Sequence, residues 1–560
     1  MSSIPINLYI QLTKKRRRVD DAPRGRRLET REPFWRRLWG LPAAWRQAVL
    51  IALALLGLLA LYAIGRLTAD IPAAYSSPED HFKYGSTGGE RSSGIPEALW
   101  KTLPVTFPEY LPPGRHRKGR EYEAFGFLYE EGKDLPIGVS RRNVMGLPRV
   151  FLNCAICHVG SVRFRKEGPR LLVPGMPSNT VDLEAFQRFL FAAAADEKFE
   201  PDRMLAEIAA VAPLDWINRV ALRYYGIFFM RQRLLILKHR FRYMDAEPDF
   251  GPGRVDTFTP AKVLLNFPLD LIPRSELGGT ADFPSVWLQR KRKGMHLHWD
   301  GNNDTVEERN RSAAFGTGAF PPTLDRASVK RTEDWLLDKE PPRYPEPIDE
   351  ARAARGRPLY ETYCASCHGR DGRDFAGARV GEVTPWEEVG TDRRRLDSYS
   401  FELSIAQGSL YAGYDDERFS HFRKTFGYAN MPLDGLWLRA PYLHNGSVPT
   451  LRDLLEPGPS RPRVFYRGYD LYDPVRVGFV SEEKYFDDEG RSRLEPGDPR
   501  RYFRFAVACD PRRDHCDKYE IQCGPKTAPM VCGNGNEGHE YGTRLSPADK
   551  DAVVEYLKTF

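Results

Sequence analysis

One five-residue pattern constrains this 560-residue chain more than any other feature, because it occurs twice. The pattern C-x-x-C-H places two thiols one helical turn apart, where they can bond the two vinyl groups on one edge of a porphyrin. The adjacent imidazole then reaches under the iron. The sequence therefore predicts two covalently bound c-type haems. The two frames are Cys154-Ala-Ile-Cys157-His158 and Cys364-Ala-Ser-Cys367-His368.

Other chemistries also use a C-x-x-C pair. A zinc site needs a second close pair of Cys or His, and the neighbouring sequence supplies none. A thioredoxin-like redox pair does not require a histidine directly after it in both copies. We therefore expect His158 and His368 to be the proximal ligands of two haem irons.

The remaining four cysteines lie within 24 residues of one another, near the C-terminal end of the chain. In an oxidising compartment, two disulfides that close a surface loop are the expected arrangement. Three pairings are possible, and the spacing does not choose among them. A metal cluster is the alternative, although the spacing fits known clusters badly. These residues are Cys509, Cys516, Cys523 and Cys532.

A long apolar run follows Arg46 and contains no charged residue until Arg66. Residues 48–65 would span roughly 27 Å as a helix, enough to cross the hydrocarbon core of a bilayer. We predict a transmembrane anchor at residues 47–66, in preference to a buried helix or a cleaved signal. The cations before it place the basic tail, residues 1–46, in the cytoplasm and the rest outside it. We therefore expect a single-pass protein of a bacterial inner membrane with its haem domains in the periplasm.

The distribution of charge excludes one class of partner. Residues 1–46 carry 12 Lys+Arg and 4 acidic residues, whereas the rest of the chain carries 71 Lys+Arg and 72 acidic residues. Binding of nucleic acid needs clustered excess cations, so we expect no nucleic-acid partner.

The fold is predicted to be mainly α, with two cytochrome c-like haem domains that contain long loops. The first domain is expected at residues 75–345 and the second at residues 346–560, after a proline-rich linker. Helical patterns occur in four segments, the third of which contains Gly356 and Tyr360 one turn apart. The apolar stretch Tyr224–Phe229 is expected to be core or a contact surface, with a groove for an apolar substrate as a further alternative. The predicted helices are 181–195, 215–242, 351–363 and a C-terminal helix with Ser546 as N-cap and Pro547 at its first position.

The residue opposite each proximal histidine decides whether an iron is closed or can bind peroxide or dioxygen. His539 lies in a Gly/Asn-rich loop before the last helix, and we expect it to be the distal ligand of the second haem. Met431 and His444 remain alternatives. His296 and His298 alternate, so in an extended stretch both would point to one face, where they could line the distal pocket of the first haem or one of them could ligate it; a structural turn is the competing interpretation. Trp299 could relay an electron or pack against a porphyrin.

Several of these segments together resemble the rubber-oxygenase-type di-haem cytochromes c, which are related to bacterial di-haem cytochrome c peroxidases. The resemblance covers most of residues 120–560. It implies a helical di-haem fold, a first haem with an exchangeable distal position and a second haem closed by two histidines, His539 being the distal one. It also implies that Trp299 and the region of Ala314 and Phe315 lie on the distal side of the first haem. We do not infer from this resemblance that the protein cleaves rubber. The segments are HLHWDGNN with Glu308-Arg309-Asn310 and Ser312-Ala313-Ala314, PLDGLWLRAPYLHNGSVPTL at Pro432–Leu451, and GNGNEGHEYGT.

These observations predict an oxidoreductase in which a redox partner protein or small electron donor reduces the second haem. The electron then passes to the first haem, where peroxide or dioxygen is reduced or activated, with His298 and Trp299 as candidate catalytic residues. The alternative is an electron-transfer cytochrome in which both irons are six-coordinate. A redox or gas sensor that signals through the anchor ranks last, because the tail has no output domain.

Overall fold

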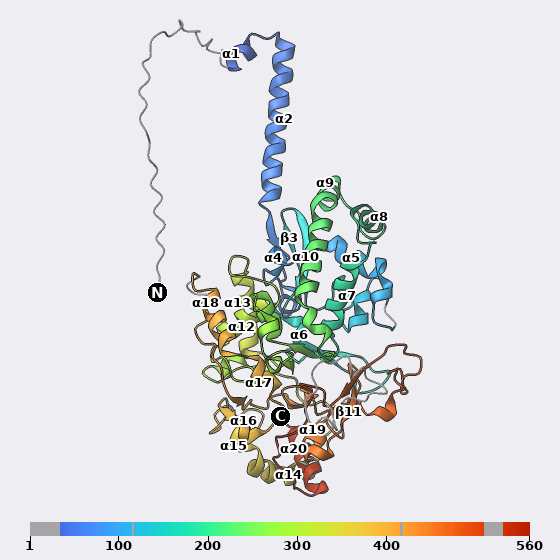
Figure 1. The fold of residues 1–560 in the computed structure, drawn as a ribbon, viewed down its shortest axis with the longest axis vertical. Coiled ribbons are helices and arrows are strands. Elements are labelled where there is room, and N and C mark those ends of the chain that lie inside the picture. The colour runs from blue at the N-terminus through green and yellow to red at the C-terminus, as the bar shows by residue number, and fades with distance from the viewer. Residues whose placement is uncertain (1–33, 115–116, 415–417, 509–529) are drawn as a thin grey trace, which may run out of the picture. The chain divides into compact units, whose positions relative to one another are not determined.

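The computed structural model describes residues 34–114, 117–414, 418–508 and 530–560 (Figure 1). The chain divides into two compact units, Met1–Leu67 and Thr68–Phe560. Most of the basic tail predicted at residues 1–46 lies outside the described residues. Thr68–Phe560 is a single compact unit, and the division into haem domains at residues 345–346 stays a prediction.

The first unit contains the apolar segment predicted as an anchor. It consists of α1 (Phe34–Trp39) and the long helix α2 (Ala43–Leu67). None of the side chains of α2 is buried, and the helix is long and apolar enough to cross a membrane. Because a helix that is apolar on every side cannot keep such a surface in water, this segment suits a bilayer.

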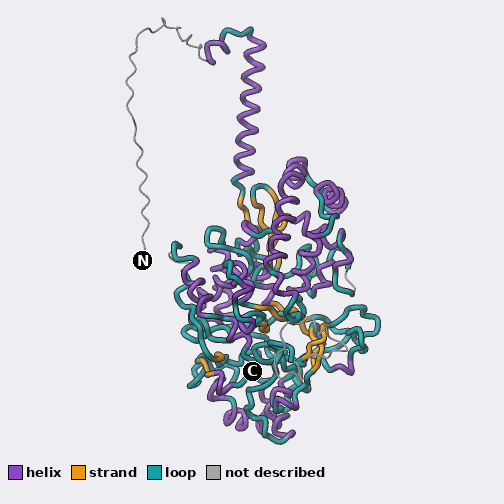
Figure 2. Tube along the Cα trace, in the orientation of Figure 1, coloured by secondary structure: helices purple, strands orange, loops and turns teal. Residues whose placement is uncertain are grey.

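The second unit is mixed α/β, so the prediction of a mainly α fold is only partly correct (Figure 2). Its largest sheet has four antiparallel strands in the order β1-β3-β4-β2. These strands are only two to six residues long, and polar residues interrupt them, so their sequence lacks the clean alternation that indicates a strand. The strands are Asp70–Pro72 (β1), Ile95–Pro96 (β2), Val139–Val144 (β3) and Leu147–Leu152 (β4).

The other sheets in the described part of the chain are two-stranded and antiparallel. They pair β5 with β6, β7 with β8, β9 with β10, β11 with β14 and β12 with β13. Their strands are Val159–Val162 (β5), Leu171–Pro174 (β6), Arg254–Asp256 (β7), Thr280–Asp282 (β8), Val383–Pro385 (β9), Gly427–Ala429 (β10), Val464–Arg467 (β11), Tyr472–Asp473 (β12), Gly478–Phe479 (β13) and Phe503–Ala506 (β14).

Helices pack around these small sheets. The predicted helix at 181–195 is observed as α7, and the predicted helix at 215–242 is observed as α9, a π-helical turn η3 and α10. The helices are Pro78–Tyr84 (α3), Gly89–Ser92 (α4), Glu97–Thr106 (α5), Ala155–His158 (α6), Leu183–Ala195 (α7), Pro201–Val211 (α8), Trp216–Ala221 (α9), Leu222–Gly226 (η3), Ile227–Arg240 (α10), Thr259–Leu264 (α11), Val306–Gly316 (α12), Arg326–Asp338 (α13), Glu350–Tyr363 (α14), Ala365–His368 (α15), Trp386–Val389 (α16), Arg394–Ser398 (α17), Phe401–Leu410 (α18), Leu451–Leu454 (α19) and Pro547–Leu557 (α20).

The last helix packs against the helix before the second C-x-x-C-H frame. Helices α14 and α20 pack closely, and a Cβ atom at Gly356 would lie 1.9 Å from the carbonyl oxygen of Ala552, so only glycine allows this approach. The Ser546 hydroxyl accepts a hydrogen bond from the Asp549 backbone N–H at 3.2 Å, as its N-cap position predicts. Such a cap stabilises a helix by about 1 kcal/mol.

A buried cluster joins the two halves of the second unit. It combines Val162 and Val173, which lie in strands next to the first frame, with Trp437 and Val553 from the C-terminal half. Burial of large side chains such as Trp437, which is fully buried, stabilises this junction by roughly 2–3 kcal/mol for each residue. The cluster therefore holds the segments around both frames in one unit.

Candidate haem-attachment sites

The first attachment site (Cys154, Cys157 and His158) lies where β4 ends and the single turn α6 begins. Both cysteines are free thiols and half-buried. The imidazole Nδ1–H of His158 donates a hydrogen bond to the carbonyl oxygen of Pro284 at 3.0 Å. A carbonyl can only accept, so Nδ1 carries the proton, and Nε2 of a neutral imidazole keeps its lone pair for a metal.

The surroundings keep the His158 imidazole neutral. Burial, together with the nearby Arg309 guanidinium, lowers the pKa of His158 to about 4. Burial also raises the pKa of the Cys154 thiol to about 11. The site thus presents a neutral imidazole at neutral pH, which is the state in which an imidazole nitrogen can bind iron.

The second attachment site (Cys364, Cys367 and His368) lies at the end of α14 and in the single turn α15. Its cysteines are likewise free and half-buried. The Nδ1–H of His368 donates to the carbonyl oxygen of Met431 at 2.8 Å. Burial lowers the pKa of His368, so this imidazole is also neutral with Nε2 available. The two sites therefore hold their histidines in the same way.

The structure brings His539 to the second site. The ring centres of His368 and His539 are 6.2 Å apart, with an angle of 43° between the ring planes. Two imidazoles that each bind one metal ion at about 2 Å have ring centres roughly 6 Å apart, so this pair fits a shared iron. Burial, followed by the effect of His368, lowers the pKa of His539 to about 3, which keeps it neutral.

The backbone holds His539 in place. Its backbone N–H donates to the carbonyl oxygen of Val389 at 2.7 Å, and its φ of +52° lies in the left-handed region that few residues other than glycine adopt. Its buried Nδ1 atom has no hydrogen-bond partner among the described residues. Strained backbone and an unpartnered buried nitrogen are both features of binding sites.

The two alternative ligands of the second site, Met431 and His444, make other contacts than His539 does. Met431 offers its carbonyl to His368, so its backbone lies on the proximal side of the site. His444 is buried, and its Nε2 shares a hydrogen bond with the Tyr428 hydroxyl at 3.0 Å while the two rings stack at 4.2 Å. The histidine that faces His368 is therefore His539.

The segment of His296 and His298 forms a tight turn, so the expectation of an extended stretch is wrong. His298 has a φ of +65°, and its Nδ1 makes a 2.6 Å hydrogen bond to the Asn302 side chain. The Nδ1 of His296 donates to the carbonyl oxygen of Gly301 at 3.0 Å. Asp300 and Asn302 follow closely in the chain, and side chains of these two types favour turns by bonding to nearby groups. The alternation of the two histidines alone does not reveal such a turn. Burial lowers the pKa of His298 to about 4.

Trp299 lies between segments that contact the two proximal histidines. Its indole N–H donates to the carbonyl oxygen of Asp282 at 2.8 Å, two residues before Pro284. Its own carbonyl accepts from the backbone N–H of Ala429 at 2.9 Å, two residues before Met431. Because Pro284 binds His158 and Met431 binds His368, Trp299 connects the supports of both sites.

Sequence reasoning gave no role to Arg309, which lies on α12 near the first site. Its charge acts on Cys154, His158 and His298, and burial lowers its own pKa to about 10, so it stays cationic at neutral pH. Within the described residues its guanidinium makes a long 3.4 Å hydrogen bond to the Asn310 side chain. Arginine usually indicates an exposed helix position, so nothing in its spacing signals that this side chain is half-buried beside the first site.

The predicted disulfide loop lies mostly outside the described residues, which include only Cys532 of its four cysteines. Cys532 is disulfide-bonded. The pairing of Cys509, Cys516 and Cys523 therefore stays a prediction.

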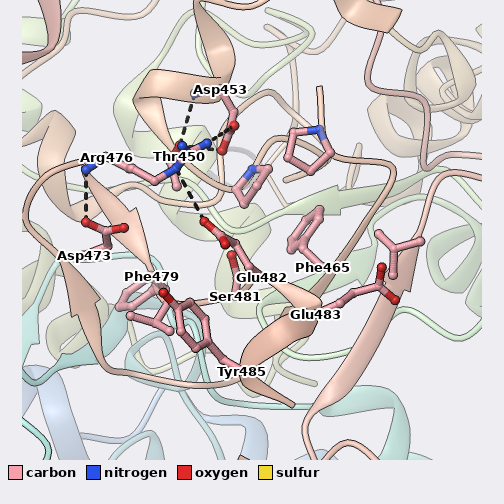
Figure 3. A pocket seen from close by; sticks show the side chains of 14 residues that line it. Thr450, Asp453, Phe465, Asp473, Arg476, Phe479, Ser481, Glu482, Glu483 and Tyr485 are labelled. Carbon is pink, nitrogen blue, oxygen red and sulfur yellow. Dashed lines mark hydrogen bonds and ion pairs between the residues drawn. The ribbon is translucent and has the colours of Figure 1, made fainter. Parts of the chain in front are cut away.

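A small pocket of about 100 Å³ lies between residues 449 and 485, away from either frame in sequence (Figure 3). Its buried carboxylate, Asp453, accepts a hydrogen bond from the Thr450 hydroxyl at 2.5 Å and forms an ion pair with Arg476. Glu482 and Glu483 lie at its edge. Because Asp453 is already paired with Thr450 and Arg476, we assign no function to this pocket.

The two C-x-x-C-H frames resemble those of c-type cytochromes, and a family comparison agrees over a limited segment. A family model described as RoxA-like, cytochrome c-like matches residues 427–466. This segment contains β10 and Met431, the residue that binds His368. The match indicates covalently bound haem and a haem-based redox function.

Two curated relatives come from Sinorhizobium fredii (strain NBRC 101917 / NGR234). The uncharacterized protein y4iM is 34% identical over 223 residues, which cover 36% of this chain and 49% of y4iM. The uncharacterized protein y4iJ is 25% identical over 546 residues, covering 78% of this chain and 84% of y4iJ. The match to y4iM thus spans about half the length of that relative.

Proposed function

We propose that this protein is a membrane-anchored, periplasmic di-haem cytochrome c that passes electrons from the second attachment site to the first. At the first site, peroxide or dioxygen would be reduced or activated. One observation carries this proposal: the two proximal histidines are held alike, but among the described residues a second histidine ring pairs with His368, at the distance that a shared iron requires, and none pairs with His158.

At the second site, Cys364 and Cys367 would hold the haem covalently, and His368 and His539 would both bind its iron. The carbonyl of Met431 fixes the orientation of the His368 ring through Nδ1. The Val389 carbonyl fixes the backbone of His539. Two strong nitrogen ligands close an iron to other molecules and favour electron transfer. This site therefore receives electrons from a donor protein or small reductant.

At the first site, Cys154 and Cys157 would hold the haem, with His158 as proximal ligand. When bound, haem supplies an iron that exchanges single electrons and can bind peroxide or dioxygen where a coordination position is open. Arg309 is a half-buried cation whose charge acts on both His158 and Cys154. A guanidinium in this place can donate hydrogen bonds to an anionic group and stabilise negative charge.

The connection through Trp299 would be the route of the electron. Starting at His368, it runs through the Met431 carbonyl and along the backbone to Ala429, whose N–H bonds to the Trp299 carbonyl. The Trp299 indole N–H then bonds to Asp282, from which the backbone leads to Pro284 and His158. We assign Trp299 this relay role, and it orients no reacting group.

A second candidate function is an electron carrier with two six-coordinate irons. The observation that favours it is the hydrogen bond between His298 Nδ1 and Asn302, which leaves Nε2 as the nitrogen that could bind iron. The low pKa of about 4 would keep this histidine neutral and able to ligate. In that case Trp299 would serve the same route, and no small molecule would react.

The spectrum of the purified ferric protein separates the two candidates. We expect an intact mass that includes two haems, one low-spin centre and one high-spin centre that reacts with peroxide or cyanide. Two low-spin centres that do not react would replace the oxidoreductase by the carrier. A protein without covalent haem would overturn both. Protease protection of tagged spheroplasts tests the orientation of the anchor, with the haem-bearing part expected on the periplasmic side.

A further inference from the structure

An exposed aromatic face runs along α9, η3 and α10. Trp216, Val220, Tyr224 and Phe228 follow one another at intervals of four residues, which places them along one side of a helix. Trp216 is 72% exposed, and the others on this face are also exposed. Of the two interpretations given to Tyr224–Phe229, core or contact surface, the exposure of its aromatic side chains favours a contact surface.

Two further aromatic residues widen this face. Tyr225 and Phe229 are 65% and 60% exposed, and their rings stack at a centre distance of 6.4 Å. The opposite side of the same helices, Leu222, Ile227 and Leu234, is buried in the large core cluster of the unit. The helices are therefore already packed on one side, and the aromatic face is a second apolar surface. We call Trp216, Val220, Tyr224, Tyr225, Phe228, Phe229 and Ile236 the aromatic face.

The helices of the aromatic face carry cations and no acidic residue of their own, although Arg223 pairs with Asp202 and Arg231 with Glu200 on the neighbouring segment. Trp216–Arg240 contains six Lys or Arg residues and no Asp or Glu. Arg219 and Lys238 are exposed among them. Aromatic and apolar residues flanked by cations are the composition of helices that lie in the interface of a bilayer with anionic headgroups. A face made for another folded protein would not require acidic residues to be absent over 25 positions.

The position of this face in the chain also favours a membrane. Only Thr68 and Ala69 separate the apolar helix α2 from β1, and such a linker reaches at most roughly 10 Å. Strand β1 pairs with β3. Within the unit Thr68–Phe560, α8, α9 and α10 lie at the same end as β3, whereas α14 and α20 lie at the opposite end (Figure 1).

From these observations we infer that the aromatic face binds the surface of the lipid bilayer as a second membrane contact besides the α2 anchor. Its aromatic rings enter the interface between headgroups and acyl chains, and its cations bind anionic phosphate headgroups. This inference depends on α2 spanning the membrane and is independent of the haem chemistry.

The test uses the full-length, haem-loaded protein in nanodiscs that contain a photoactivatable phosphatidylglycerol. We expect lipid adducts on peptides from Trp216–Ile236, severalfold more in phosphatidylglycerol discs than in phosphatidylcholine discs. The double variant Tyr225→Ser/Phe229→Ser should lose most adducts while both haems remain attached. The matched control is Phe401→Ser/Ile405→Ser, which alters another exposed apolar pair on α18 and should leave the adducts unchanged.

Three results would overturn the inference. The first is the absence of adducts on Trp216–Ile236 in wild-type protein, which needs no variant to interpret. The second is equal labelling in both kinds of disc, since it would remove the role of the cations. The third is cross-linking of the aromatic face to a second copy of the chain in discs shown by mass photometry to hold two copies.

Discussion

The first attachment site follows a β-strand, and the second follows a 14-residue α-helix. Both sites nevertheless hold the proximal histidine through Nδ1 and a backbone carbonyl, Pro284 in one case and Met431 in the other. The difference lies on the opposite side. His539 faces His368, whereas His298 is bonded into its own turn, and at the first site the half-buried Arg309 adds a positive charge that acts on His158.

This contrast indicates that a C-x-x-C-H frame defines attachment and the proximal ligand, but not the chemistry. The partner of His368 comes from a loop 171 positions later in the chain, which no local pattern near the frame announces. Under the proposed function, the two frames would serve different purposes, one closed for electron transfer and one open for a small molecule.

The largest effect is expected from removing the cysteines of one frame. Cys154→Ala/Cys157→Ala and Cys364→Ala/Cys367→Ala should each lower the intact mass by one haem, because each pair bonds a separate porphyrin. The first variant should lose its reaction with peroxide, and the second should lose reduction by an electron donor. Ser366→Ala, an exposed change inside the second frame, is the control and should retain two haems. Retention of two haems by either double variant would contradict the assignment.

The next largest effect should follow from opening the second site. His539→Ala removes the imidazole that faces His368, so the second iron should become high-spin and bind carbon monoxide when reduced. Electron paramagnetic resonance and the optical spectrum would record the change. His444→Phe keeps the stacking on Tyr428 and should leave the spectrum unaltered. If the low-spin signal survived in His539→Ala but vanished in His444→Phe, the ligand would have to be reassigned.

The parts of the fold that local sequence determines were predictable. Ser546 and Pro547 predict the start of the last helix, because capping acts within a few residues. The short strands were missed, since pairs such as β3 and β4 carry arginine and asparagine among their apolar residues. The hydrogen bond of His158 to Pro284 crosses 126 positions, and such contacts leave no periodic signal.

Removing the positive charge of Arg309 near the first site should weaken the binding of anions more than it slows electron transfer. Arg309→Gln should weaken cyanide binding at the first site by roughly 10- to 100-fold, since a charge-assisted hydrogen bond contributes about 1.5–3 kcal/mol. Titration of the ferric protein with cyanide measures this. The control is Arg311→Gln on the same helix, which should bind cyanide as the wild type does. An unchanged affinity in Arg309→Gln would show that the guanidinium does not reach the bound anion.

The smallest effect tests the connection between the sites. Trp299→Phe keeps an aromatic ring but removes the N–H that bonds to Asp282, costing about 1 kcal/mol of stability and slowing transfer between the sites severalfold. Stopped-flow reduction, monitored at both haems, separates the two effects. Trp386→Phe loses a similar indole hydrogen bond, to the carbonyl of Thr391, outside the connection, so it should lose stability without slowing transfer. Equal rates in both variants would mean that the electron crosses by another route, and that Trp299 contributes only to packing between the two sites.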